Sequence, residues 1–220
     1  MSTILITGAN RGIGLSLTQL YLARGDTVIG VCRSASDELN SSGAEVITGV
    51  DVSQDSGVEK LKTELSGRTI DVLINNAGIL RKSSLDSLDI EQIREQFEVN
   101  AIGPLRVVAA LRSNLSRGSK IGLITSRMGS IDDNDSGSSY GYRMSKSALN
   151  AAGKSLSVDL KNEGVAVALL HPGWVNTEMV NYNGLIEPEE AAAGLAARID
   201  ALNLENSGGF WHSNGDRLPW

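Results

Sequence analysis

Cysteine is almost absent from this 220-residue sequence, which excludes an internal disulfide. Cys32 is the only one, and together with His171 and His212 it does not form the spacing of a zinc site. A chain without disulfides suits a reducing compartment, and we therefore expect a cytoplasmic protein. We also expect no bound metal.

Long apolar runs and blocks of like charge are missing as well. No segment approaches the about 18 apolar residues that cross a membrane, and Gly8, Asn10 and Arg11 come too early for the apolar core of a signal peptide. The sequence therefore predicts neither a membrane anchor nor a cleaved leader. Twenty Lys and Arg against 26 Asp and Glu give a net charge of −6. Without a basic stretch, we expect no nucleic-acid partner.

Proline is scarce, with 4 residues, whereas glycine is plentiful, with 24. Hydrophobic residues make up 41 % of the chain, which is near the average for a globular protein and does not indicate disorder. The length suits one α/β domain, so we expect residues 1–220 to form a single domain. The positions of the glycines then become informative.

Short runs of Val, Ile and Leu recur along the chain and predict buried parallel strands, because both faces of each run are apolar. Six runs fit this description: Thr3–Thr7, Thr27–Val31, Glu45–Val50, Val72–Asn75, Lys120–Ser126 and Val165–Leu170. A short seventh strand is expected near Phe210–His212. Stretches with helical spacing lie between the runs, and a last helix should begin at Pro188, where two glutamates follow the proline. The alternation predicts a doubly wound α/β fold.

Three glycines follow the first predicted strand in a segment that we call the glycine loop, Thr7-Gly8-Ala9-Asn10-Arg11-Gly12-Ile13-Gly14. At a strand-to-helix turn, glycine lets the backbone turn sharply and lets a pyrophosphate approach the positive end of the helix. The G-x-G-x-x-G fingerprint fails, because Leu17 stands where its third glycine would be. The loop favours nucleotide binding, with an ordinary strand-turn-helix as the alternative.

Two arginines favour a nucleotide with a phosphorylated ribose. Arg33 follows the second predicted strand, where an NAD site would place an acidic residue for the ribose 2′-hydroxyl, and Arg11 lies in the glycine loop. Guanidinium groups in these positions would bind a 2′-phosphate. The sequence therefore predicts NADPH (NADP⁺) rather than NAD(H), with two solvated surface arginines as the alternative.

Tyr142 and Lys146 form a candidate acid/base pair at the start of a predicted helix. Residues four apart share one helix face, and a nearby ammonium lowers the pKa of a phenol from its usual value of about 10. Tyr140 lacks such a partner, because position 144 is Met. An ordinary exposed helix pair is the alternative.

Ser126 ends the fifth predicted strand, at the sheet edge where doubly wound folds bind ligands. Its hydroxyl could bond a substrate carbonyl and stabilise the charge that builds on the oxygen. A serine hydrolase is not indicated, because the chain has neither a Gly-x-Ser-x-Gly motif nor a suitably placed histidine.

In combination, these residues resemble the short-chain dehydrogenase/reductase family over nearly the whole chain. The matching motifs are Thr7-Gly8-x3-Gly12-x-Gly14, Asn75-Asn76-Ala77-Gly78, Asn100, Ser126, Tyr142-x3-Lys146 and Pro172-Gly173-x-Val175-x-Thr177. Tyr142–Asn150 and His171–Val175 are most similar to the short carbonyl-reductase-like members, which include C-factor and sniffer. The resemblance implies a Rossmann fold with about seven parallel strands in the order 3-2-1-4-5-6-7, flanked by helices.

The resemblance also implies a catalytic set of Asn100, Ser126, Tyr142 and Lys146. Tyr142 would donate the proton in the reducing direction, and Ser126 would orient the carbonyl. Lys146 would lower the pKa of Tyr142 and hold the nicotinamide ribose. Asn100 would hold a water that relays protons, or else be a core residue that bends a helix.

For the cofactor, the resemblance places Asp51 at the adenine amino group, unless it caps a helix, and Val52 beside the ring. Val175 would donate its amide to the nicotinamide carboxamide, and Thr177 would bind the carboxamide or the pyrophosphate. The full set of expected cofactor-binding residues is Gly8, Asn10, Arg11, Gly12, Ile13, Gly14, Arg33, Asp51, Val52, Asn76, Ala77, Gly78, Tyr142, Lys146, Pro172, Gly173, Val175 and Thr177.

These expectations describe an NADPH-dependent reductase of a small-molecule carbonyl, which would be a ketone, aldehyde or quinone. Two alternatives stay open: a 3-oxoacyl-carrier-protein reductase, and a C-factor-like NADP(H)-binding signalling protein whose main role is not catalysis. Ala148, Ala151, Ala152 and Ser155 would let a second helix approach closely, so we expect a homodimer.

Two segments would border the site. Glu178–Glu187, which we call the flap, is too short for the helix pair that closes the pocket in many family members. We therefore expect an open site, with Trp174, Met179 and Tyr182 on one side. The segment Ile131–Ser139, which we call the rim loop, would form the other side.

Overall fold

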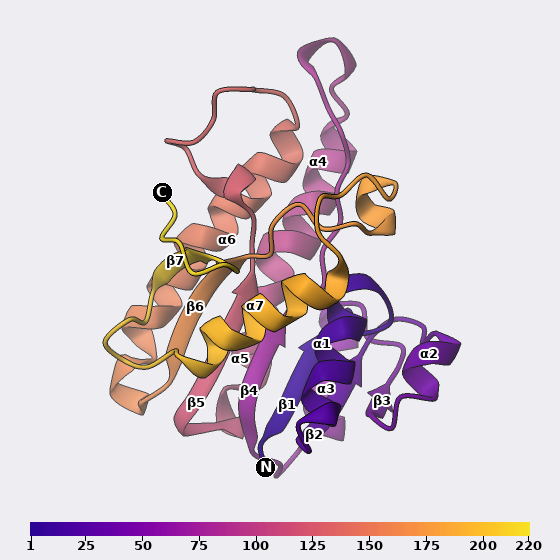
Figure 1. Ribbon diagram of the computed structural model, residues 1–220, viewed down its shortest axis with the longest axis vertical. Helices are drawn as coiled ribbons and strands as arrows, with labels where there is room; N and C mark the ends of the chain where they lie inside the picture. The colour runs from indigo at the N-terminus through magenta and orange to yellow at the C-terminus, as the bar shows by residue number, and fades with distance from the viewer.

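Seven parallel strands form one sheet in the order β3-β2-β1-β4-β5-β6-β7 in the computed structural model, which describes residues 1–220 (Figure 1). The strands are β1 (Thr3–Thr7), β2 (Thr27–Val31), β3 (Glu45–Ile47), β4 (Ile70–Asn75), β5 (Leu115–Ile124), β6 (Ala166–His171) and β7 (Gly209–His212). The predicted fold class and strand order are confirmed. Because the order reverses between β1 and β4, the ligand crevice of such a fold lies at the carboxyl ends of these strands.

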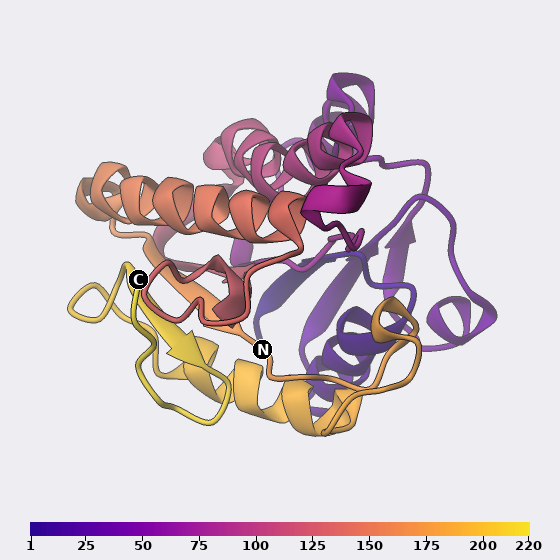
Figure 2. The same ribbon diagram turned by 90° about the horizontal axis from the view of Figure 1, so that it is seen from above.

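Seven α-helices cover the two faces of the sheet. They are α1 (Gly12–Ala23), α2 (Asp37–Asn40), α3 (Asp55–Glu64), α4 (Ile90–Phe97), α5 (Gly103–Ala110), α6 (Tyr140–Asp159) and α7 (Pro188–Asp200). Leu5 of β1 belongs to the core cluster shared with α3, α5 and α6, whereas Ile4 and Ile6 belong to the cluster shared with α1, α2 and α7. Figure 2 shows the yellow-orange α7 and the indigo α1 below the sheet, opposite the salmon α6. Both faces of the sheet are therefore buried.

Strand ends differ from the prediction where glycine changes the backbone. Glu45–Val50 was predicted as one strand, but β3 ends at Ile47, because Gly49 turns the chain with a φ of +72°. On β5 the ladder begins at Leu115, earlier than predicted, and it continues past Gly118 with a shift in register. Helix α7 begins at Pro188, as predicted.

The element that carries Asn100 was not predicted. A short π-helix, η2 (Glu98–Ile102), joins α4 to α5, and it carries Asn100. A π-helix places an extra residue in the turn and is often found at functional sites. No helix combines the length and the apolar character that spanning a membrane would require.

Candidate active site

The glycine loop leaves the N-terminus of α1 open to a ligand. Gly8 has a φ of +67°, a region that residues with a side chain rarely adopt. Gly14 lies so close to the turn that an added Cβ would be 2.1 Å from the main-chain oxygen of Gly8. No side chain caps the first amides of α1, because the cap residue Arg11 makes no such hydrogen bond. These amides therefore fit a pyrophosphate.

The segment after β4 is tied to the glycine loop by hydrogen bonds. Asn76 Nδ2 donates to the main-chain oxygens of Thr7 and Gly8, at 3.0 and 3.1 Å. Thr7 Oγ1 in turn accepts from the amides of Asn76 and Ala77, both at 3.1 Å. Part of the Asn-Asn-Ala-Gly motif is thus used to hold the cleft together, while Gly78 lies beside Asn100 and Lys146.

Arg11 has a carboxylate partner that the sequence did not predict. Its guanidinium forms an ion pair with Glu178, the first residue of the flap. The flap reaches the glycine loop at this point, since an added Cβ on Gly12 would lie 3.2 Å from Thr177 Cγ2. A 2′-phosphate that binds Arg11 must therefore compete with the Glu178 carboxylate.

Arg33 follows β2, the strand beside β1, and it is exposed and has no ion pair. Its charge helps to lower the pKa of Asp51: burial raises that pKa, but hydrogen bonds from the hydroxyl and amide of Ser53 and the nearby Arg33 outweigh burial. Asp51 does not cap α3, whose cap residue is Gln54. Val52 is buried and packs against Gly103.

Tyr142 and Lys146 face the interior from one side of α6. They are 8 % and 4 % exposed, which excludes the alternative of an ordinary exposed pair, whereas Tyr140 is partly exposed. Lys146 Nζ lies 5.8 Å from the centre of the Tyr142 ring and donates to the main-chain oxygen of Ile124 at 2.8 Å. The helix spacing therefore does bring the phenol and the amine together.

The predicted lowering of the Tyr142 pKa is wrong for the structure described here. Burial raises the pKa of Tyr142 to about 12, although a hydrogen bond with Ser126 acts in the opposite direction. Burial also lowers the pKa of Lys146 to about 8. Both groups lie in an apolar interior that favours their neutral forms, and the amine points to the Ile124 carbonyl. Tyr142 is therefore protonated at neutral pH.

Ser126 follows β5 and caps the short helix η4 (Arg127–Gly129). Its Oγ accepts a hydrogen bond from the amide of Met128 at 3.1 Å, and its hydroxyl lies close enough to Tyr142 to act on the pKa of that phenol, which it lowers. The side chain is buried at 7 % exposure. Ser126 lies just beyond the end of the strand rather than in it, since β5 ends at Ile124. The predicted serine and tyrosine thus meet at one point.

Asn100 is fully buried behind this pair. Its Oδ1 accepts from the amide of Ile79 at 2.8 Å, and its Nδ2 donates to the Ile79 oxygen at 2.8 Å and to Ser145 Oγ at 3.0 Å. The π-helix directs the Asn100 side chain into the core. The alternative reading of Asn100, as a core residue in a bent helix, therefore describes part of its role. The bonds fix the segment after β4 against α6.

The flap contains a single short helical turn, η6 (Glu178–Val180), and no helix pair. It folds back on the segment after β6, where Leu185 N donates to the Trp174 oxygen at 2.7 Å. Trp174 and Tyr182 are exposed, at 55 % and 70 %. The flap and the rim loop both rise above the carboxyl edge of the sheet (Figure 1). The only four non-glycine residues with positive φ are in these two segments: Ser138, Ser139, Asn181 and Tyr182.

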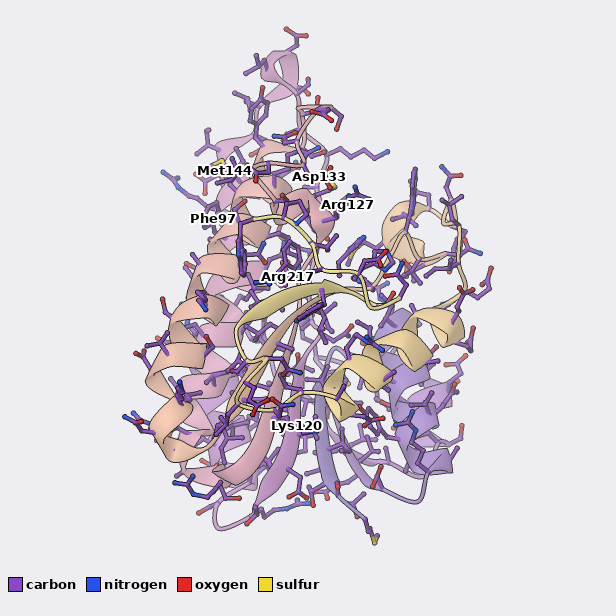
Figure 3. The ribbon with its side chains drawn as sticks, turned by 60° about the vertical axis from the view of Figure 1, so that its left-hand side comes forward. Phe97, Lys120, Arg127, Asp133, Met144 and Arg217 are labelled. Carbon is purple, nitrogen blue, oxygen red and sulfur yellow. The ribbon has the colours of Figure 1, made fainter.

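A cavity of about 470 Å³ lies on the outer side of α6, under the rim loop. Phe97, Met128, Ile131 and Met144 supply its apolar lining. Figure 3 shows Phe97 and Met144 close together at this place. No residue of the predicted catalytic set lines the cavity, so it is separate from the site.

Sequence reasoning missed two residues that shape the site. Glu178 follows Thr177 directly, and its charge opposite to that of Arg11 was the available signal. Trp220 contacts the start of the rim loop through its main-chain oxygen. Contacts to one main-chain oxygen from residues 88 to 90 positions earlier leave no pattern in a single sequence.

Comparisons with known proteins agree with this geometry. The family model for short chain dehydrogenases matches residues 2–185. A 1-hydroxy-2-glutathionyl-2-methyl-3-butene dehydrogenase of Rhodococcus sp. (strain AD45) is 43 % identical, and the alignment covers 100 % of both chains. The C-signal of Myxococcus xanthus is 43 % identical over 69 % of this chain and 93 % of its own. A solved carbonyl reductase of Pseudomonas aeruginosa PAO1 in complex with NADP has a TM-score of 0.87 and 34 % identity, with 100 % of both chains covered.

Proposed function

Because the chain belongs to the short-chain dehydrogenase/reductase family, and is thereby an oxidoreductase with a nicotinamide cofactor, we propose that it is an NADPH-dependent carbonyl reductase. The observation that carries this proposal is the buried contact between Tyr142 and Ser126, with Lys146 beside the tyrosine ring. A proton donor and a hydroxyl that can orient a carbonyl oxygen meet there at the ligand edge of the sheet.

The cleft residues fit NADPH. The uncapped amides of α1 would hold the pyrophosphate, Val175 and Thr177 the nicotinamide end, and Asp51 the adenine. Arg33 supports the choice of NADPH over NADH, because its guanidinium is exposed and has no carboxylate partner. Bound in this way, the nicotinamide supplies the hydride.

The chain itself supplies orientation and the proton. Ser126 Oγ would bond the substrate oxygen, and the Tyr142 hydroxyl would protonate it as hydride arrives. Since burial keeps the pKa of Tyr142 at about 12, the proton is present at any physiological pH. Lys146, with a pKa of about 8, is mostly charged at neutrality and would stabilise the phenolate that remains. Asn100 holds the segment around Ile79 in place.

The open mouth of the site favours broad substrate specificity. Trp174 and Tyr182 expose aromatic surface beside the cleft, and no helix pair covers it. Flat aromatic carbonyls and quinones can stack on such a surface, whereas small aliphatic carbonyls gain little from it. We therefore propose quinones and aromatic aldehydes as the better substrates.

NADPH consumption measured with menadione, benzaldehyde and acetone tests these proposals. We expect turnover in the order quinone, aromatic aldehyde, acetone, with Trp174→Ala raising KM for menadione at least fivefold. A preference for acetone that Trp174→Ala leaves unchanged would contradict the open aromatic site. NADPH binding without turnover of any carbonyl, a 3-oxoacyl-carrier-protein thioester included, would favour the signalling alternative.

A second candidate function follows from the full-length relative named as dehydrogenating a glutathionyl alcohol. The same residues would then work in reverse, with Tyr142 accepting the proton of an alcohol. Oxidation of a glutathione-conjugated alcohol with NADP⁺ or NAD⁺ tests this candidate. If the conjugate is oxidised faster than any of the tested carbonyls is reduced, the dehydrogenase function is favoured over the carbonyl reductase function.

We also propose that the chain forms a homodimer. The outward sides of α5 and α6 expose Leu105, Met144 and Val158, at 43 %, 49 % and 64 %. Apolar residues beside the small Ala151 and Ser155 would let two such faces pack together. Light scattering should give twice the chain mass of 23.3 kDa, and a 23.3 kDa particle at micromolar concentration would contradict the dimer.

A further inference from the structure

The turn Ser130–Asp133, which leads into the rim loop, is held by Trp220 at the far end of the chain. The main-chain oxygen of Trp220 accepts hydrogen bonds from the amides of Ile131 and Asp132, both at 2.9 Å, and from Ser130 Oγ at 3.0 Å. Three donors of one turn thus converge on one acceptor. Ser130 Oγ also accepts from the amide of Asp133 at 3.1 Å, which completes the network.

Trp220 is itself fixed on the body of the sheet. Its ring stacks on that of Phe210 in β7, with 5.6 Å between the ring centres and 29° between the planes. Phe210 is buried and packs with Leu169 of β6 and with Leu218, whose amide donates to the Phe210 oxygen at 2.9 Å. The oxygen that holds the turn is therefore tied to the core through an aromatic stack.

The turn lies directly beyond the catalytic serine. Ser126 caps η4, and the residue after η4 is Ser130. Arg127 also forms an ion pair with Asp133 across the same turn, and Figure 3 shows these two side chains together above the tail that carries Arg217. A shift of the turn would move η4 and the hydroxyl that orients the carbonyl.

We propose that Trp220 is a positioning residue for the carbonyl substrate, which it serves by fixing Ser130–Asp133 and, through η4, Ser126. The inference rests on the proposed reductase function. It concerns the substrate side alone, because none of these contacts reaches the glycine loop. The expected signature is a change in KM for the carbonyl at constant affinity for NADPH.

The test compares three variants of the full chain. Trp220→Ala removes the stack and should raise KM for menadione at least fivefold, while the Kd for NADPH stays within twofold. Trp220→Phe keeps an aromatic ring on Phe210 and should restore KM to within twofold. Arg217→Ala is the matched control, since this exposed residue of the same tail contacts Trp211 rather than the turn.

Amide hydrogen exchange supplies a readout that does not require activity. The amides of Ile131 and Asp132 should be protected in the parent protein, exposed in Trp220→Ala and protected again in Trp220→Phe. Unchanged exchange at these amides, or a proportional loss of NADPH binding and substrate binding, would overturn the positioning role. A parent protein that reduces no carbonyl but shows the expected exchange would overturn the proposed function and leave the anchoring of the turn intact.

Discussion

The two halves of the sheet edge at the carboxyl ends of the strands are built in different ways. Around β1 and β2 the cleft is built from main-chain groups and glycines, with Arg33 exposed at its end. Around β5 and α6 the site is built from side chains, and Ser126, Tyr142 and Lys146 are each at most 8 % exposed. One half offers shape and surface charge, and the other offers buried polar groups.

The difference has an energetic consequence. A buried amine is costly unless it is neutral or paired, which is why the pKa of Lys146 falls to about 8. An exposed guanidinium such as that of Arg33 costs little, because water screens its charge. The site around β5 and α6 therefore lowers the stability of the fold, whereas the cleft around β1 and β2 does not. Substitutions in the first half should change both activity and stability, and substitutions in the second should change mainly cofactor binding.

The largest effect on activity is expected from substitutions around β5 and α6. Tyr142→Phe should lower kcat by about 10²-fold or more while leaving NADPH affinity within a few-fold, since the hydroxyl acts mainly in the transition state. Steady-state kinetics and cofactor titration measure the two quantities. Tyr140→Phe is the matched control, and equal damage from it would show that the tyrosine is wrongly assigned.

Lys146→Met should separate activity from stability. We expect weaker NADPH binding and lower kcat, but a gain in the free energy of unfolding at pH 7 of roughly 1–3 kcal/mol, because the charged amine is no longer buried. The pKa of Lys146 lies below its usual 10.5, so the gain should shrink as pH rises from 8 to 10.5. Urea denaturation at pH 7 and pH 10 checks this, and a destabilised variant at pH 7 would refute it.

Arg33→Asp tests the cleft around β1 and β2. We expect the KM for NADPH to rise at least tenfold, because the loss of one charge-assisted pair costs roughly 1.5–3 kcal/mol. The difference in KM between NADPH and NADH should become smaller. The melting temperature should not change. Equal efficiency with NADPH and NADH in the parent protein would remove the basis of this prediction.

The pH profile of reduction should follow Lys146 rather than Tyr142. Above pH 8 the amine loses its proton and no longer stabilises a phenolate, so kcat/KM should be level below pH 8 and fall above it. Tyr142, with a pKa of about 12, stays protonated throughout. The fall should be absent from the residual activity of Lys146→Met, and a profile that rises above pH 8 would contradict this role.

The smallest effect is expected where the two halves meet, at the Arg11–Glu178 ion pair. Exposed pairs contribute up to about 1 kcal/mol, so Glu178→Gln should free Arg11 and improve NADPH affinity about two- to fivefold. NADH, which lacks the 2′-phosphate, serves as the internal control and should bind unchanged. Weaker binding of NADPH would show that the pair supports the cofactor rather than competing with it.

The sequence predicted the sheet well, because buried parallel strands are apolar on both faces and glycine marks the turn to α1. It also placed Tyr142 and Lys146 on one helix face, since helical spacing is regular. It could not predict their burial, and so the direction of the Tyr142 pKa was wrong. The π-helix around Asn100 and the contact of Trp220 with the rim loop depend on tertiary packing, which no local pattern encodes.

The four residues with left-handed backbone in the flap and the rim loop bear on how such an enzyme can change. Ser138, Ser139, Asn181 and Tyr182 adopt conformations that cost free energy for a residue with a side chain, and all four lie away from the sheet. Glycine at any of them would relieve that cost and leave the core untouched. Single substitutions can therefore change the stability of the mouth of the site without disturbing the buried residues below it.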